Sequence, residues 1–104
     1  MRAKDLIKLI PSHIRITRNV TYEVVWVDEF LKDNKQLGEC RFDTKQILIN
    51  KNQSPSEAYC TMLHEIFHAI SFETDGLNLT EKQVQKLERS TFRVLKLNGM
   101  LEKM

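Results

Sequence analysis

Two histidines that flank a glutamate are the residues of this sequence best suited to chemistry. His64-Glu65-Ile66-Phe67-His68 places two imidazoles four residues apart. On a helix, residues i and i+4 lie one turn apart on one face, so both rings would point at one spot. Two neutral imidazole nitrogens can bind Zn²⁺ at about 2.0–2.1 Å, and the neighbouring Glu65 can then accept a proton from a metal-activated water. The pattern predicts a zinc site with Glu65 as general base.

A catalytic zinc site of this kind needs a third protein ligand. The extended motif that supplies a third histidine is absent, because Ser71 and Thr74 stand where its glycine and histidine would be. The next helical segment offers Glu81 and Glu88, which are seven residues apart and share a face. They are separated by about 10.5 Å along the helix axis, so one ion can take only one of them. The residues alone leave this choice open.

Other metal-ligating residue types are weaker candidates for the same site. Glu73 points about 140° away from His68 on an ideal helix, and Asp75 lies beyond the helix. Cys60 lies one turn before His64 and is a conceivable fourth ligand, although a buried, unreactive cysteine is the better prediction. We expect His13 to be a structural or surface residue. If the motif binds no metal, its two histidines are ordinary helix residues beside a solvated glutamate.

The histidine motif lies inside a segment with helical start and stop signals. Ser54-Pro55-Ser56-Glu57 is a capping box with proline at the first helical position, and the helix should run to about Phe72. A second capping box, Thr80-Glu81-Lys82-Gln83, starts another helix, which should end at Asn98-Gly99. On this second helix we expect one stripe to face the core, formed by Glu81, Val84, Glu88, Thr91 and Leu95.

The first half of the chain has β-type composition. Residues 14–27 are rich in β-branched and aromatic residues, and 21–27 is the strongest strand candidate. Residues 39–42 and 46–50 flank a short polar segment and predict a hairpin. A short helix over 3–10 should precede these strands and end at Pro11. The predicted fold is α+β, with about three mostly antiparallel strands and both long helices on one face.

Composition limits the class of protein. With 104 residues, 41% of them apolar, the chain is long enough for one domain, which we expect to span residues 1–104. A formal charge of +2 is too mild to indicate nucleic-acid binding, even though residues 2–18 are locally basic. No apolar stretch is long enough to span a membrane, charges interrupt any signal-peptide core, and two cysteines form no disulfide framework. We therefore expect a cytoplasmic protein.

About sixty residues resemble a known family. The sequence is similar to small phage- and prophage-associated zinc metallopeptidases related to the ImmA/IrrE group, which are of gluzincin type. H-E-x-x-H is the specific motif, and the rest of the similarity is a pattern of residues. The resembling segments are residues 37–38, 44–50, 63–70, 79–84 and 94–98.

The resemblance implies a minimal zincin with His64 and His68 as ligands and Glu65 as general base. An acidic residue near the start of the second helix in relatives corresponds to Glu81, which we favour. Glu88 remains the alternative, because it follows His68 by twenty residues, as in larger thermolysin-type gluzincins. Zincins commonly bind substrate as a strand added to a sheet edge, for which 46–50 is a candidate, although core packing suits that segment better.

These observations support two functional hypotheses. The first is a zinc-dependent metallopeptidase that hydrolyses peptide bonds in a protein or peptide substrate. The alternative is a metal-stabilised binding protein without turnover, such as a phage accessory protein acting on a host protein. Larger family members carry a DNA-binding partner or domain, for which 104 residues leave no room, so a regulatory role would need a partner protein.

Overall fold

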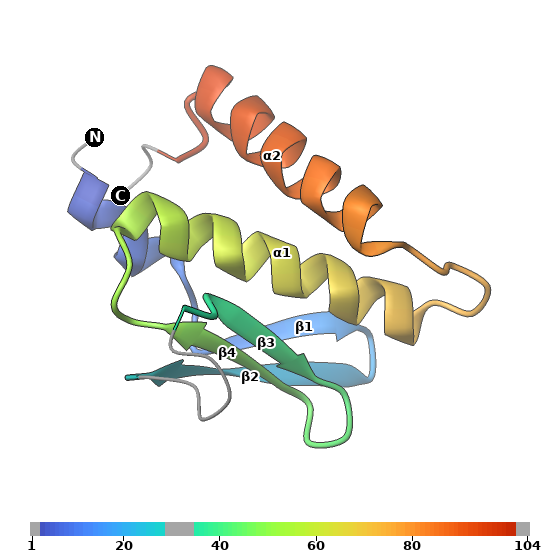
Figure 1. Ribbon diagram of the computed structural model, residues 1–104. Coiled ribbons are helices and arrows are strands. Elements are labelled where there is room, and N and C mark those ends of the chain that lie inside the picture. Colours follow the sequence, from blue (N-terminus) through green and yellow to red (C-terminus); the bar gives the residue numbers. More distant parts are fainter. Residues whose placement is uncertain (1–2, 29–34, 102–104) are drawn as a thin grey trace.

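A four-stranded sheet carries one long helix on its face, and a second long helix lies on the first (Figure 1). The computed structural model describes residues 3–28 and 35–101. The elements in chain order are η1 (Ala3–Leu9), β1 (His13–Thr17), β2 (Val20–Val27), β3 (Gly38–Arg41), β4 (Gln46–Asn50), α1 (Pro55–Glu73) and α2 (Glu81–Leu97).

The sheet has the strand order β1-β2-β4-β3 and is mixed. Both hairpin pairs, β1 with β2 and β3 with β4, are antiparallel. The two central strands, β2 and β4, are parallel, with Val24 opposite Ile47 and Trp26 opposite Ile49. β3 is therefore an edge strand and β4 an interior strand.

The expected number of strands needs correction. The β-rich segment 14–27 forms two strands, β1 and β2, because the chain turns at Arg18 and Asn19. The sheet consequently has four strands instead of three. Residues 46–50 form an interior strand and not a substrate edge, which agrees with the core packing favoured for this segment. Residues 28–37 are polar and charged, which predicts a helical turn or a loop, and most of them lie outside the described part of the chain.

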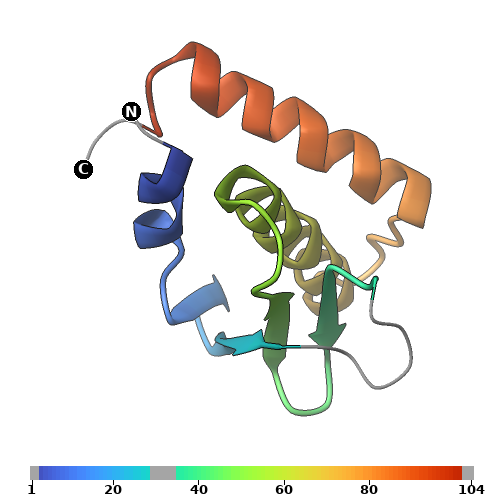
Figure 2. The same cartoon turned by 60° about the vertical axis from the view of Figure 1, so that its left-hand side comes forward.

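α1 packs across the sheet, and the core lies between them (Figure 2). The sheet contributes Tyr22, Ile47 and Ile49, which are fully buried. From α1, Ala58, Tyr59, Met62, Leu63 and Ala69 join this core, together with Leu6 and Ile10 at the N-terminal end and Leu101 after α2. The core therefore holds α1 in place from both sides along most of its length.

Both long helices begin where their capping boxes predict. Ser54 and Glu57 bond each other's backbone N–H at the start of α1, and Thr80 and Gln83 do the same for α2. α1 ends one residue after the expected position. At the other end, Asn98 caps α2 as predicted.

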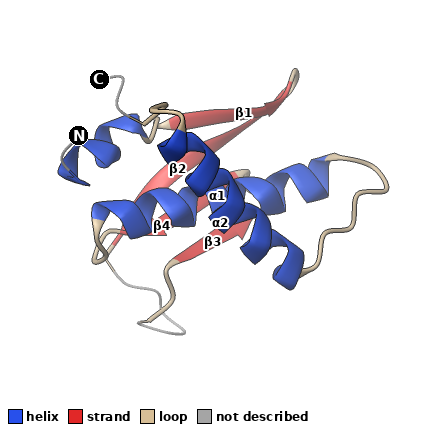
Figure 3. Cartoon of the chain, turned by 90° about the horizontal axis from the view of Figure 1, so that it is seen from above, coloured by secondary structure: helices blue, strands red, loops and turns tan. Residues whose placement is uncertain are grey.

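α2 contacts α1 and none of the other described helices or strands (Figure 3). Only Val84 of α2 is fully buried, while Leu87 and Val94 stay exposed at the flank of its contact face. α2 is therefore attached to the molecule through α1 alone. Among the described residues, no helix combines the length and apolar character needed to cross a membrane.

Candidate metal centre

The two histidines of the motif face each other on α1, as their spacing predicts. The Nε2 atoms of His64 and His68 are 3.2 Å apart, and the ring planes meet at 63°. Both side chains are mostly buried, with exposed fractions of 17% and 25%. The buried apolar residues around them on α1 set this orientation, because they fix which face of the helix turns away from the sheet.

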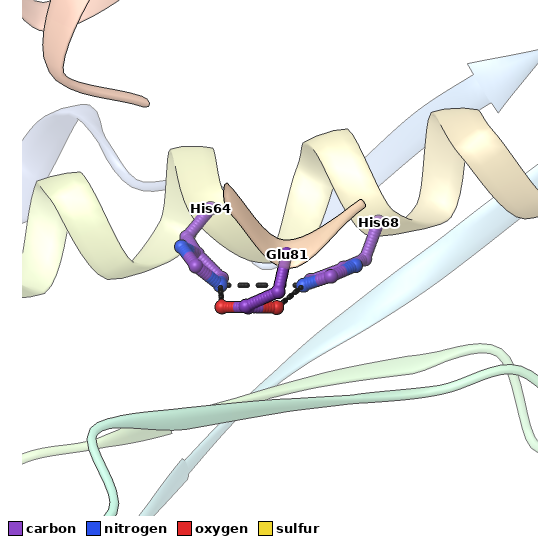
Figure 4. Close-up of side chains that lie close together, drawn as sticks. All are labelled: His64, His68 and Glu81. Atoms are coloured by element: carbon purple, nitrogen blue, oxygen red, sulfur yellow. Dashed lines mark hydrogen bonds and ion pairs between the residues drawn. The ribbon is translucent and has the colours of Figure 1, made fainter. Parts of the chain in front are cut away.

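Glu81, the first residue of α2, completes the cluster. One of its carboxylate oxygens lies 2.7 Å from His64 Nε2 and the other 2.8 Å from His68 Nε2 (Figure 4). Ser71 sets this position, because its hydroxyl donates to the Leu77 carbonyl and accepts from the Leu79 N–H just before α2. The loop between the helices is thereby fixed at two points next to Glu81.

Glu88 lies on the opposite side of the His64 ring. Its Oε1 is 2.9 Å from His64 Nδ1, and a carboxylate can only accept, so Nδ1 carries the proton. In the neutral ring this leaves the Nε2 lone pair directed at Glu81 and His68. A carboxylate on the second ring nitrogen is the usual way in which metal-binding histidines are oriented. Of the two candidate acids, Glu81 thus contacts the Nε2 atoms and Glu88 the Nδ1 atom.

The converging atoms suit a divalent metal. Two ligands at about 2.0–2.1 Å from a tetrahedral zinc ion are about 3.3–3.4 Å apart, close to the observed separation of the two Nε2 atoms. His64, His68 and Glu81 can each offer one ligand atom within 4.8 Å of the others. The imidazole nitrogens, when neutral, and the carboxylate oxygens all direct lone pairs at the same point. A cation bound between them would stabilise this arrangement. The donor set fits zinc, with Glu81 exposed enough to leave one side open.

Glu65 faces a cavity next to this cluster. It lines a space of about 650 Å³ between α1 and α2 together with His64 and the start of β3. The pKa of Glu65 is raised to about 7, mainly by burial; His64 opposes this rise, and the carboxylates of Glu81, Glu39 and Glu88 add to it. A carboxyl group in this setting changes protonation near neutral pH.

Glycine 38 lets the edge strand approach Glu65 closely. A Cβ at this position would lie 2.4 Å from Thr61 Cγ2 and 3.0 Å from Glu65 Oε2. Thr61 is held in turn by Gln53, whose side-chain oxygen accepts from the Thr61 hydroxyl at 3.0 Å. Residues 37–38 were only one of the segments that resemble the family, and the close approach that Gly38 allows was not predicted.

The edge strand β3 presents free backbone groups beside Glu65. The Asn50 N–H donates to the Leu37 carbonyl. The register then directs the backbone N–H and C=O groups of Glu39 and Arg41 toward β4. Gly38 and Cys40 therefore direct their N–H and C=O groups to the open side of the sheet. The Gly38 carbonyl already accepts from the Gln36 side chain at 2.9 Å, while the Cys40 N–H and C=O have no hydrogen-bond partner among the described residues.

The remaining candidates lie outside the cluster. Glu73 accepts hydrogen bonds from Lys45 and Tyr22 at the far end of α1. Burial raises the pKa of the Cys60 thiol to about 11, so it stays protonated, and it is absent from the group of potential metal ligands found among the described residues. His13 is exposed on β1 and bonds Ser12.

Comparison with protein families matches residues 21–101 to Peptidase_M78, the IrrE N-terminal-like domain. The chain belongs to this family. The matched range of this IrrE N-terminal-like domain covers all three residues of the cluster, Glu65 and the edge strand. Neither the comparison with curated proteins nor that with solved structures found a match. Membership of a peptidase family indicates a metallopeptidase-like function and a protein or peptide as substrate.

Proposed function

We propose that this protein is a zinc-dependent peptidase, with zinc held by His64, His68 and Glu81 and with Glu65 as general base. The observation that carries the proposal is the convergence of three metal-binding side chains beside a buried glutamate, in a chain of a peptidase family. A bound zinc ion would supply a Lewis acid that acidifies water and polarises a peptide carbonyl.

The protein residues carry the proton transfers. Glu65 would accept the proton of the attacking water and pass it to the nitrogen of the departing amine, which leaves the peptide bond cleaved and Glu65 ionised again. The cavity that Glu65 shares with His64 gives the water access to its carboxylate. Glu88 orients His64 and touches neither water nor substrate in this proposal.

The edge strand would hold the substrate. An extended peptide can pair with the backbone groups of an open sheet edge, and β3 is the edge next to Glu65. The N–H and C=O groups of Cys40 supply this pairing. A peptide bound there would run between β3 and the metal-binding residues of α1.

Metal content and peptide cleavage test the proposal together. The purified protein should hold about one zinc ion per chain by elemental mass spectrometry, and His64→Ala should lose it. Glu65→Gln should keep the metal and the fold but lose cleavage of a fluorogenic peptide mixture, because glutamine cannot accept the proton. A wild type that binds no zinc at neutral pH would refute the site. Metal binding without any cleavage, with Glu65→Gln indifferent, would instead support the metal-stabilised binding protein.

A further inference from the structure

The metal-ligand cluster stands between two cavities. The one described above lies on the His64 side, and a second, of about 380 Å³, is lined by His68 at the other end of α1. The end of α1 and the connection to α2, at the right of Figure 1, line most of this second cavity. Its lining combines the apolar side chains of Phe42, Phe72 and Leu79 with the polar side chains of Ser71, Thr74, Asp75 and Asn78. The proposed chemistry makes no use of it.

Two stacked phenylalanines form a wall of this cavity. The rings of Phe42 and Phe72 have centroids 4.4 Å apart and planes 13° from parallel. Lys45 Nζ lies 5.0 Å from the Phe72 ring centroid and is itself held by an ion pair with Glu73. Although Phe72 is 57% exposed, its ring is thus fixed by contacts from the β3–β4 hairpin. The exposed part of the Phe72 ring is therefore held in a defined orientation beside His68.

The pair of phenylalanines directly follows the edge strand β3, because Phe42 is the next residue after it. Gly38 and Cys40 turn their side-chain positions toward α1, and Phe42, two residues further, stacks on α1 through Phe72. A peptide paired with β3 would therefore pass His68 and reach this cavity within a few residues of the cleaved bond. Because side chains of an extended peptide alternate in direction, one of them would point into the space beside Phe72.

We propose that the cavity beside His68 binds a large apolar side chain of the substrate, aromatic or long aliphatic, and so sets the cleavage specificity. This inference rests on the proposed peptidase function. Burial against the two rings favours an apolar side chain, and offset stacking favours an aromatic one. The rim residue Asp75 is exposed and anionic, and it disfavours an acidic side chain at the same position.

Cleavage of a peptide library by the zinc-loaded protein tests the specificity. Mass spectrometry of the products should reveal one position near the cleaved bond that is enriched in Phe, Tyr, Leu or Met and depleted in Asp and Glu. Phe72→Ala should lower kcat/KM for peptides with Phe at that position by about tenfold or more and flatten the preference. Phe72→Leu should retain part of it. Leu97→Ala, which removes another exposed apolar side chain in the last turn of α2, should change neither.

Binding without turnover provides a second measurement. A peptide with Phe at the preferred position should bind Glu65→Gln more tightly than its Ala counterpart, and the double variant Glu65→Gln/Phe72→Ala should lose that difference. In NMR spectra, the aromatic resonances of Phe42 and Phe72 should shift with the first peptide. Cleavage or binding with no preferred position, or a preference that survives Phe72→Ala, would overturn this inference while leaving the peptidase intact. A zinc-loaded wild type that neither cleaves nor binds peptides would refute both.

Discussion

Glu88 contacts His64 on the ring edge opposite to the nitrogen that faces His68 and Glu81. The Nδ1 to Oε1 distance of 2.9 Å is that of a hydrogen bond, and a carboxylate acceptor increases the basicity of the other ring nitrogen. Glu81 and Glu88, the two alternative third ligands from the sequence, therefore contact the same histidine on opposite sides of its ring. α2 packs on α1 so that each acid contacts a different ring nitrogen of His64.

Removing Glu88 should weaken metal binding without abolishing it. We expect Glu88→Ala to lower zinc affinity by about 10–100-fold, measured by competition with a chromophoric chelator, because His64 loses its fixed orientation. Glu88→Gln keeps an acceptor oxygen and should lose less. Loss of affinity as complete in Glu88→Ala as in His64→Ala would mean that Glu88 is itself a ligand.

Gly38 should tolerate no side chain while Thr61 keeps its methyl group. Gly38→Ala places a Cβ 2.4 Å from Thr61 Cγ2, which should lower the free energy of unfolding by about 1–3 kcal/mol, as overpacking does elsewhere. Thr61→Ser removes that methyl group and keeps the hydroxyl that bonds Gln53. Urea denaturation of the double variant should therefore recover part of the lost stability. Equal and additive losses in the two single variants would contradict this account.

The stability of the β3–β4 hairpin on α1 should depend on pH through Glu73. Hydrogen bonds from Lys45 and then from Tyr22 hold the pKa of this carboxyl below its usual value of 4.5. The unfolded chain thus takes up the proton more readily than the folded one. The contribution is complete above the usual carboxyl pKa and is lost as the pH falls through the lowered value.

Denaturation curves between neutral and acidic pH measure this effect. Glu73→Gln should be less stable than the wild type at neutral pH and should lose less stability on acidification. Glu23→Gln, an exposed carboxyl on β2, serves as the control and should keep the pH profile of the wild type. A Glu73→Gln profile that runs parallel to the wild type at all pH values would contradict the role of this carboxyl.

Removal of the metal should loosen α2 more than any other element. α2 packs on α1 alone among the described helices and strands, and the proposed ligands join the two helices. In hydrogen-exchange mass spectrometry, chelation should increase exchange in 81–97 and change 46–50 little. Free zinc at 100 times its dissociation constant should add about 2.7 kcal/mol to the free energy of unfolding. Uniform exchange across both segments would show that the metal does not act as a link between the helices.

Local signals in the sequence account for the two long helices and for the orientation of His64 and His68 toward each other. The capping boxes at Ser54 and Thr80 are contained within four residues each, so they predict the helix starts without knowledge of the fold. The facing of His64 and His68 follows from helical geometry alone. These predictions needed only contacts within one turn or one cap.

The strand order and the roles of the two acids depend on distant contacts. Parallel pairing of β2 with β4 joins segments over twenty residues apart, and no local pattern distinguishes it from an antiparallel meander. Likewise, Glu81 and Glu88 share one face of α2, and only the crossing of the helices separates their partners. The aromatic wall of Phe42 and Phe72 joins a hairpin to a helix end thirty residues away, and the sequence contains no signal for it.

The open edge of β3 has a consequence for how the protein behaves at high concentration. Unpaired edge backbone can pair with another copy of the same chain as readily as with a peptide, which leads to aggregation. Here β3 is only four residues long, and the Gln36 amide occupies one of its outward carbonyls. The Glu39–Arg41 ion pair places charge along the strand on the face away from α1. A strand this short and this charged would disfavour an extended intermolecular sheet, while it could still pair with the short peptide stretch of the proposed function.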